Sequence, residues 1–490
     1  MSHFFINEIN LDPKSTRPLY IQLANSLAFL IKRGILKPGF KLPGTRELAK
    51  LLGLNRNTVF SALDELTAEG WLISEKRKGF YVNKELPLLR VRELNKRKIG
   101  KYPSQTPYPI SRKLDWIVSD SHHLKLDFND GYPDLRLAPV QEIRKEYTSI
   151  LTTSPLKSML SYADPRGDEK LRASIAAMLK NKRGLEVSPG QVMITRGSIM
   201  GLYLLSQILV SKGDAFAMEN PGYSGAERCF KAARCHILQI PVDQKGMDVD
   251  NLENHLQNYQ VRAVYVTSHH QHPTTVSLAP ERRMQLLQLA QKQHFAIIED
   301  DYDYEFHYEN KPLLPIASAD HTGCVIYIGS FSKTLFPSLR IGYLVAPESL
   351  IDNLARLRSI IDNNGDTVLE RALSRIIDNG VYYRYVRKSL NQYRQRKNLF
   401  CSILDRDLSE WVSYEKPEGG MSVWANFDKK IQLNKLAETC FRNGLLLSGS
   451  KCSNADGSLM NAARLGFASM NIEEIEEASQ ILRSAIKFSL

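Results

Sequence analysis

From residue 126 onward, short runs rich in β-branched and aromatic residues alternate with segments of helical periodicity. Such alternation is typical of a largely parallel sheet whose strands are connected by crossover helices. In a sheet of this kind, ligands bind where the strands end. We therefore expect an α/β domain with a ligand site at those ends. The expected strands are VMIT (192–195), AFAM (215–218), RAVYVT (262–267), FAIIED (295–300), VIYIGS (325–330) and RIGYLVA (340–346).

With 490 residues the chain is too long for one hydrophobic core, because single cores stop growing at roughly 250–300 residues. We predict an N-terminal domain over residues 1–83, a basic linker over 84–125 and the α/β domain over 126–490. The linker contains four prolines in a cationic segment with little periodicity, which favours an irregular connector. It either lets the N-terminal domain reach another subunit or is a passive tether.

Most of the positive charge lies in the first quarter of the chain. Residues 1–83 contain 12 Lys or Arg and 7 Asp or Glu, and residues 84–125 contain 10 and 4. These two segments therefore carry +11 of the formal net charge of +12. Such an excess is typical of a region that contacts nucleic-acid phosphates, and a solvated basic surface is the alternative. Because no apolar run reaches the ~20 residues of a membrane span and no signal peptide is evident, we expect a cytoplasmic protein without a membrane partner.

The N-terminal domain has the pattern of three helices. Between Pro18 and Pro38, leucines recur every three to four residues, which predicts one apolar helix face. Thr45 is the expected N-cap of a second, short helix, and Asn55 is the expected N-cap of a third helix over 56–69. The inward face of this third helix is expected to contain Val59, Leu63 and Leu66.

The start of the third helix is left exposed by this pattern. Arg56, Asn57 and Thr58 lie there, where a recognition helix presents side chains to base edges in the major groove. The following stretch, WLISEKRKGFYV, alternates as a hairpin with Gly79 near its tip and three cations beside it. A wing that contacts phosphates has this composition. On the pattern alone, a protein-binding module is the alternative.

The residues themselves resemble a known family. The run LYxQLxxxLxxxIxxGxLxPGxKLPxTRELAxLLGxxRNTVxxALxxLxxEGW, over 19–71, is similar to the winged helix-turn-helix of GntR-type regulators. Two positions differ from the family pattern: Gly44 stands where a serine is common, and Phe80 stands where a threonine is usual. These differences affect which operator sequence we expect the domain to prefer, and they do not affect the prediction that it binds DNA. The resemblance implies DNA contacts from Arg46, Arg56, Asn57, Thr58 and Gly79.

Reactive and charged side chains follow two of the expected strands. The strand VIYIGS ends at Ser330, and Ser332 and Lys333 follow it. Arg340 lies seven residues beyond the lysine. A lysine in a semi-enclosed site can have its pKa lowered from ~10.4 and attack an aldehyde as a neutral amine. Two hydroxyls and an arginine suit a phosphate dianion. The strand FAIIED ends at Asp300, and a buried carboxylate needs a cation, such as the protonated pyridine nitrogen of pyridoxal 5'-phosphate (PLP).

Taken together and in this order, these residues resemble the fold-type I aminotransferases over roughly residues 126–490. The resemblance implies a homodimer that binds PLP, with Lys333 as the catalytic lysine that forms the Schiff base. It also implies that Asp300 pairs with the pyridine nitrogen, that Tyr302 donates to the ring oxygen and that Tyr223 stacks on the ring.

The same resemblance implies which residues bind the phosphate of the cofactor and the carboxylate of an amino-acid effector. Arg464 in AARLGF matches the arginine that binds an amino-acid α-carboxylate through its bidentate fork. Backbone N–H groups at a helix start would cradle the phosphate. The implied phosphate ligands are Gly197, Ser198, Ser330, Ser332, Arg340 and Tyr162, the last in many relatives from the neighbouring subunit.

One segment departs from the aminotransferase pattern. Where those enzymes carry an Asn-Pro-Thr-Gly run beside the cofactor, this chain has QHPTT, so His272 replaces an asparagine that helps tune the ring oxygen. The segment instead resembles the HQxPT run of MocR-type regulators, the GntR subfamily that fuses both domains. A zinc site from His269, His270 and His272 is the competing interpretation, but no fourth ligand is evident and the six cysteines show no zinc spacing. We therefore expect no metal.

We predict a transcriptional regulator that binds operator DNA as a homodimer and senses a small amine, an amino acid or PLP itself through an internal aldimine at Lys333. Such sensing requires that the ligand bind the two conformations of the dimer with different affinity. The alternative is a PLP-dependent aminotransferase with an accessory DNA-binding domain, because the groups for at least a half-transamination are present.

Overall fold

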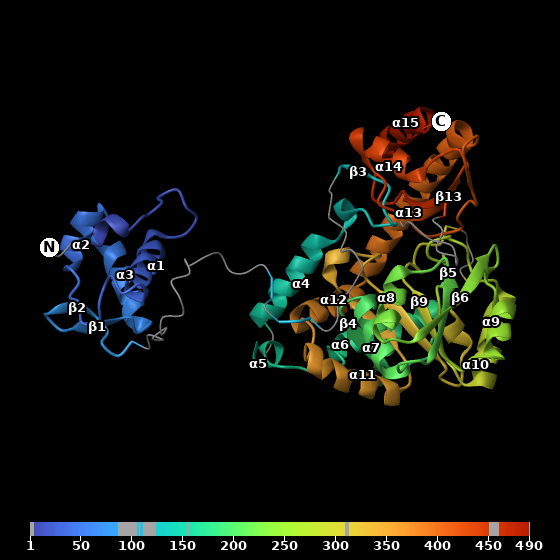
Figure 1. The fold of residues 1–490 in the computed structure, drawn as a ribbon. Coiled ribbons are helices and arrows are strands. Elements are labelled where there is room, and N and C mark those ends of the chain that lie inside the picture. Colours follow the sequence, from blue (N-terminus) through green and yellow to red (C-terminus); the bar gives the residue numbers. More distant parts are fainter. Residues whose placement is uncertain are drawn as a thin grey trace. The chain divides into compact units, whose positions relative to one another are not determined.

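The computed structural model describes residues 4–86, 105–106, 108–110, 124–153, 156–308, 313–449 and 460–489. The chain forms two compact units, Met1–Val118 and Ser119–Leu490 (Figure 1). Most of the predicted linker, 84–125, lies outside the described residues, so its irregular conformation and the exact domain limits stay predictions. Among the described residues, no helix is long and apolar enough to cross a membrane.

The first unit is a small helical bundle with a hairpin, as the periodicity predicts. Val59, Leu63 and Leu66 are buried in its core, which confirms the predicted inward face of the third helix. The segment 39–42, before the second helix, supports the wing by hydrogen bonding to its second strand. Gly39 N donates to Val82 O, and Leu42 N donates to Phe80 O. The elements are α1 (Leu19–Lys32), α2 (Thr45–Leu52), α3 (Arg56–Ala68), β1 (Leu72–Glu75) and β2 (Gly79–Val82).

The two predicted helix caps have different outcomes. Asn55 caps α3 as predicted, because its side chain accepts a 2.9 Å hydrogen bond from Asn57 N. The prediction for Thr45 is wrong: Thr45 is the first residue of α2, and the N-cap is Gly44, which has no side chain to accept a bond. Gly53 ends α2 with a left-handed backbone, φ 64°, a conformation that glycine adopts without steric cost.

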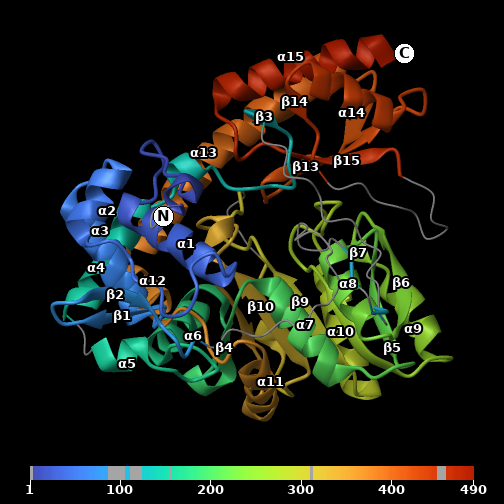
Figure 2. The same ribbon diagram turned by 60° about the vertical axis from the view of Figure 1, so that its left-hand side comes forward.

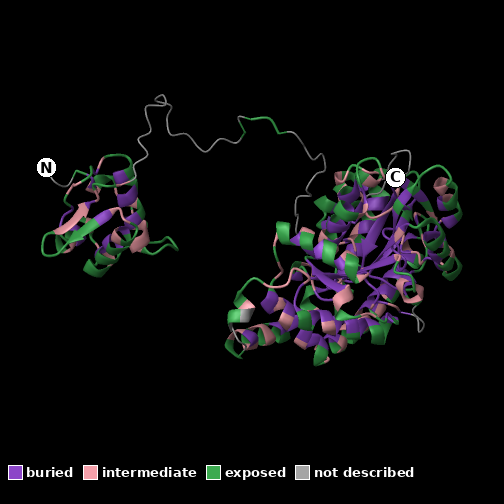
Figure 3. Cartoon of the chain, turned by 90° about the horizontal axis from the view of Figure 1, so that it is seen from below, coloured by how far each residue is buried: buried purple, intermediate pink, exposed green. Residues whose placement is uncertain are grey.

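The second unit is built on an eight-stranded sheet with the order β4-β11-β10-β9-β8-β5-β6-β7. The neighbours from β10 to β6 are parallel, so the predicted mostly parallel α/β fold is confirmed. Figure 3 shows these strands as the buried centre of the unit. Their bounds are β4 (Val192–Thr195), β5 (Ala215–Asn220), β6 (His236–Asp243), β7 (Gly246–Met247), β8 (Val261–Val266), β9 (Ala296–Asp301), β10 (Val325–Ser330) and β11 (Gly342–Val345).

One predicted strand runs against its neighbours. β11 is antiparallel to both β10 and β4. The reason is the short connection over residues 331–341, because a parallel return needs a crossover of about a dozen or more residues. This turn contains Lys333 and Arg340, so the reversal of the chain places both at the edge where β9 and β10 end.

Helices cover the sheet, and a smaller layer formed mainly by C-terminal residues lies beside it (Figures 1 and 2). That layer contains the antiparallel sheet β12-β13-β15 and the parallel pair β14-β3. Its strands are β3 (Leu126–Asp127), β12 (Val412–Tyr414), β13 (Ser422–Phe427), β14 (Leu445–Leu446) and β15 (Ala462–Gly466). The helices of the unit are α4 (Val140–Thr153), α5 (Leu156–Leu160), α6 (Glu169–Arg183), α7 (Ser198–Leu209), α8 (Ser224–Ala232), α9 (Val249–Leu256), α10 (Pro280–Gln293), α11 (Glu348–Ile361), α12 (Thr367–Asp378), α13 (Val381–Ile403), α14 (Leu433–Arg442) and α15 (Ile472–Ser489).

Candidate functional site

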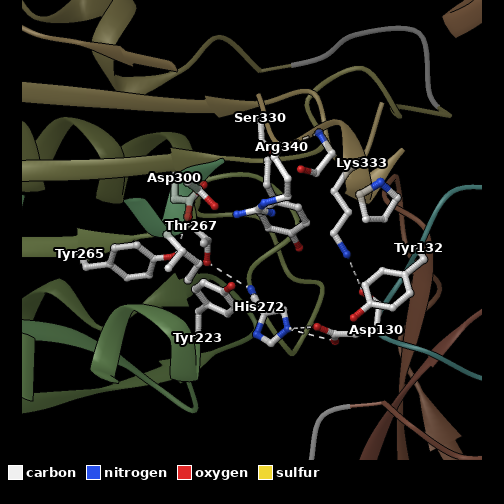
Figure 4. Close-up of a pocket in the computed structure, with 15 residues that line it drawn as sticks. Asp130, Tyr132, Tyr223, Tyr265, Thr267, His272, Asp300, Ser330, Lys333 and Arg340 are labelled. Carbon is white, nitrogen blue, oxygen red and sulfur yellow. Dashed lines mark hydrogen bonds and ion pairs between the residues drawn. The ribbon is translucent and has the colours of Figure 1, made fainter. Parts of the chain in front are cut away.

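A pocket lies where β8, β9 and β10 end, as the sheet topology predicts (Figure 4). Nine residues that the sequence singled out line it, together with others that it did not. The lining comprises Asp130, Tyr132, Ser198, Ile199, Tyr223, Tyr265, Thr267, His272, Asp300, Tyr302, Ser330, Ser332, Lys333, Pro337 and Arg340.

Lys333 extends into the pocket from the turn between β10 and β11. Its Nζ donates hydrogen bonds to the carbonyl oxygens of Asp130, at 2.9 Å, and Gly131, at 2.8 Å. It also lies 4.5 Å from the centre of the Tyr132 ring. Burial lowers the pKa of Lys333 to about 8, although the nearby Asp130 carboxylate opposes the shift. About one tenth of this amine is therefore neutral at pH 7, far more than for an ordinary lysine, and the neutral form is the one that attacks a carbonyl.

Asp300, the last but one residue of β9, lies on the opposite side of the pocket (Figure 4). Its Oδ2 accepts a 2.9 Å hydrogen bond from the Tyr265 hydroxyl. Its Oδ1 is buried and has no hydrogen-bond partner among the described residues. Burial raises the pKa of Asp300 to about 7, against the effect of the Tyr265 hydrogen bond. A buried carboxylate oxygen without a partner is costly, so this position suits a cationic N–H donor.

The start of α7 forms a cradle for an anion. Gly197 is the N-cap of α7 with φ 76°, so the backbone there has a left-handed conformation that favours glycine. A Cβ at Gly197 would lie 2.7 Å from Nη2 of Arg340, which itself has φ 51°. The guanidinium therefore packs directly on the backbone at the positive end of the helix dipole, beside Ser198.

Two serines complete this cradle. Ser330 is the last residue of β10, and its Oγ accepts a 3.2 Å hydrogen bond from Ser332 N. The Ser332 Oγ is buried and has no hydrogen-bond partner among the described residues. A hydroxyl in this situation is available to an anionic ligand, so the cradle has the donors that a phosphate group needs.

His272 lies in the pocket next to an acidic residue that the sequence analysis did not identify. Its Nε2 donates to both carboxylate oxygens of Asp130, at 3.0 and 2.9 Å. The ring of Tyr223 packs edge-on against the His272 ring, with centroids 5.2 Å apart. Burial lowers the pKa of His272 more than the Asp130 carboxylate raises it.

Tyr302 and Arg464 contact one another at the back of the pocket. Arg464 Nη2 donates to the Tyr302 hydroxyl over 3.1 Å, and that hydroxyl donates to the carbonyl oxygen of His270 over 2.6 Å. Arg464 is 1% exposed and its Nε lies 3.4 Å from Oδ1 of Asp130.

Two predicted cofactor residues, Gly197 and Tyr162, are absent from the pocket lining. Gly197 packs against Arg340, which lines the pocket. Tyr162 is 87% exposed within the single chain. The resemblance places the equivalent tyrosine on a neighbouring subunit in many relatives, so its exposure here is compatible with that prediction.

The three histidines of the competing zinc interpretation contact three different carboxylates. His269 Nδ1 lies 3.2 Å from Asp301, and His270 Nδ1 lies 2.9 Å from Asp303, while His272 pairs with Asp130. Within the described part of the chain, no group of three or more His, Cys, Asp or Glu side chains could hold a metal ion. The histidines of this segment therefore contact separate carboxylates.

The site residues that sequence reasoning missed are Asp130, Tyr132, Tyr265 and Thr267. The first two belong to a turn, FNDGYP, whose composition predicts only a change of chain direction. The signal for the other two was available, because Tyr265 and Thr267 bring hydroxyls to the end of the otherwise apolar strand RAVYVT. A buried hydroxyl usually has a hydrogen-bond partner, and here Tyr265 binds Asp300.

In the first unit, the predicted DNA contacts lie on the surface. Arg46 on α2 and the first residues of α3, Arg56 and Asn57, are exposed, and Thr58 is partly buried. Gly79 opens β2, directly after the cationic tip of the hairpin at residues 76–78. Exposed cations at a helix start and on a hairpin tip are positioned as base-reading and phosphate-contacting groups are in winged helices.

Comparisons with known proteins agree with both units. The aminotransferase class I and II family model matches residues 122–482, and the model of bacterial regulatory proteins of the gntR family matches residues 19–82. The probable rhizopine catabolism regulatory protein MocR of Rhizobium meliloti is 30% identical over 478 residues, which are 97% of this chain and 95% of MocR. The HTH-type transcriptional regulator TauR of Rhodobacter capsulatus is 29% identical over 473 residues, which are 95% of this chain and 96% of TauR.

Solved structures resemble the second unit. A multiple substrate aminotransferase from Thermococcus profundus has a TM-score of 0.68 and 29% identity, and covers 74% of this chain and 91% of its own. The α-aminoadipate aminotransferase LysN from Thermus thermophilus, complexed with N-(5'-phosphopyridoxyl)-L-leucine, has a TM-score of 0.69 and 26% identity. That match covers 74% of this chain and 92% of LysN.

Fold, pocket and similarity thus define the class: a winged helix joined to an aminotransferase-like domain whose cofactor is PLP. The chain belongs to the MocR-type subfamily of the gntR family of bacterial transcriptional regulators. The residues present fit the cofactor. The partnerless Asp300 oxygen matches its pyridine nitrogen, the cradle at Gly197 matches its phosphate, and the Lys333 amine, whose pKa burial lowers, matches its aldehyde.

Proposed function

We propose that this regulator senses a small amine or amino acid, or PLP itself, at the Lys333 pocket and changes its binding to an operator in response. The observation that carries the proposal is that one pocket contains both the Lys333 amine, whose pKa burial lowers to about 8, and the partnerless oxygen of Asp300. When bound, PLP supplies an aldehyde carbon that amines attack and an electron-withdrawing ring. Lys333 would hold that carbon covalently until an effector amine replaces its Nζ.

The other pocket residues would bind and orient the cofactor. Asp300 Oδ1 would accept the hydrogen of the pyridine nitrogen while Tyr265 holds Oδ2 in place. Tyr223 would stack on the ring, and His272 and Tyr302 would lie near the ring oxygen. The phosphate would be held by the cradle of Gly197, Ser198, Ser330, Ser332 and Arg340.

Two further elements of the proposal concern the assembly. The exposure of Tyr162 supports a homodimer in which each subunit contributes this tyrosine to the phosphate site of the other.

A regulator must reach the chromosome, so we place the protein in the cytoplasm. Arg46, Arg56, Asn57, Thr58 and Gly79 would contact the operator, and Arg464 would bind the α-carboxylate when the effector is an amino acid.

The test combines absorbance and DNA binding. The purified full-length protein is titrated with PLP, and its binding to DNA from upstream of its own gene and its neighbours is then measured with and without candidate amines. A PLP-dependent visible band together with DNA affinity that shifts with an amine supports the proposal. Steady transamination with a keto acid and no specific DNA binding would instead make the chain an aminotransferase.

A further inference from the structure

A carboxylate of the chain itself lies where the proposed function requires the carboxylate of an amino-acid effector. Asp130 belongs to the turn that follows β3, and its Oδ1 lies 3.4 Å from Nε of Arg464. Both of its carboxylate oxygens also accept hydrogen bonds from His272 Nε2. Figure 4 shows the side chain directed into the pocket beside Tyr132 and below Lys333.

Each nitrogen of the Arg464 guanidinium has a polar neighbour, although Nε forms no hydrogen bond among the described residues. Nη1 donates to the carbonyl oxygen of Pro273 over 3.2 Å, Nη2 donates to the Tyr302 hydroxyl over 3.1 Å, and Nε faces Asp130. The side chain is 1% exposed, so bulk water does not screen these contacts. An incoming carboxylate can bind the remaining Nη hydrogens, but it must then lie close to these three groups.

Asp130 is the group of the three that opposes such a ligand by charge. Burial by itself would raise the pKa of Asp130, but the attraction of His272, Arg464 and Lys333 outweighs it and holds that pKa below its usual range. The carboxylate is therefore ionised at neutral pH. Two carboxylates close to one buried guanidinium repel each other, so the first suppresses binding of the second.

We propose that Asp130 is an internal competitor for Arg464 and thereby a specificity determinant of the effector site. It raises the concentration at which carboxylate-bearing effectors bind, and it does not oppose amines that lack a carboxylate. This inference rests on the proposed function, in which Arg464 binds the effector's α-carboxylate. The same turn accepts the hydrogen bonds of Lys333 through the carbonyl oxygens of Asp130 and Gly131, so it contacts both groups that an amino acid would engage.

The test uses propionate, a carboxylate without an amine, and the full-length protein loaded with PLP. Calorimetric titration gives its dissociation constant for the wild type, for Asp130→Asn and for Asp130→Ala. We expect at least tenfold tighter propionate binding in both variants, and no gain in the affinity for ethylamine, whose ammonium group the Asp130 carboxylate attracts. The matched control is Asp127→Asn, which removes the same charge from the same segment, where Asp127 contacts Ser448 instead.

The outcomes separate this inference from the proposed function. Propionate affinity that is unchanged in folded Asp130→Asn and Asp130→Ala proteins overturns the inference, as does an equal gain in the Asp127→Asn control. The gain must also disappear in the double variant Asp130→Asn, Arg464→Gln, because competition at any other group predicts that it persists. The propionate titration contains neither amine nor DNA. A tenfold gain in propionate affinity therefore supports the inference even if no amine alters DNA binding, and that second result would contradict only the proposed function.

Discussion

Tyr265 donates a hydrogen bond to Oδ2 of Asp300 at 2.9 Å and leaves Oδ1 of the same carboxylate buried without a partner among the described residues. The substitution Asp300→Asn keeps the shape of the side chain but removes its charge. We expect PLP affinity to fall at least tenfold, because the pyridinium loses its buried counter-ion. Equilibrium titration with PLP measures the change.

The control for this variant is Asp352→Asn on α11, where the side chain is 56% exposed and lies outside the pocket lining. It should leave PLP affinity within about twofold of the wild type, since exposed ion pairs contribute little. Equal losses in both variants would contradict the assignment of Asp300 as the counter-ion of the ring nitrogen.

The ionisation of Lys333 predicts how covalent attachment of PLP depends on pH. Burial lowers the pKa of this amine from 10.5 to about 8, and only the neutral form attacks an aldehyde. The attachment rate should therefore rise as the pH increases through about 8 and level off above it. Because Asp130 raises the pKa of Lys333, Asp130→Asn should move the midpoint to lower pH. Stopped-flow absorbance gives the profile, and a rate that still climbs near pH 10 would show an ordinary lysine.

Replacing Lys333 separates cofactor binding from DNA binding. In Lys333→Ala the visible band of covalently bound PLP should disappear. Nonspecific DNA binding should stay intact, because the cations that we expect to contact DNA lie in the other unit. Spectra and gel-shift titration measure the two properties, with the exposed Lys231→Ala on α8 as control. Loss of both properties in the variant would mean that Lys333 is needed for the structure itself.

The exposed start of α3 predicts which residue reads bases. If Arg56 contacts a base edge, Arg56→Ala should weaken specific operator binding by ~1–3 kcal/mol and relax the preference at one base pair. Arg33→Ala, at the C-terminal end of α1, removes an equal charge away from α3 and serves as control. Competition titrations with mutated operators give the specificity ratio, and an unchanged ratio in Arg56→Ala would refute its role.

The position of Tyr162 predicts a complementation experiment. Tyr162→Phe should weaken PLP binding, because the phosphate loses a hydrogen bond supplied by the partner subunit. Mixing this variant with Lys333→Ala should restore one complete site in each mixed dimer, which has an intact Lys333 on one subunit and an intact Tyr162 on the other. Absorbance of the mixture measures the restored sites. Failure to restore them would place Tyr162 outside the partner's site.

Much of the fold and of the candidate site could be predicted from the sequence, because the decisive signals are local. Apolar periodicity and the Asn55 cap predict the third helix of the winged domain, and strand composition predicts the sheet with Lys333 and Asp300 at its ends. In a largely parallel sheet, topology alone brings strand ends together. Strand reversal at β11 follows from the length of one connection, which is also visible in the sequence.

Only the tertiary structure decided which groups pair inside the pocket. Asp130 and Arg464 are separated by most of the length of the second unit, and no periodicity relates a turn after β3 to a residue of β15. The same is true of the Asp300 oxygen without a partner, since whether a buried atom is satisfied depends on every neighbour that packing brings near it. The sequence by itself therefore determined which chemical groups the site contains and that they lie where the strands of the sheet end. Long-range packing decided which of these groups pair with one another, how their pKa values shift, and that Asp130 lies beside Arg464.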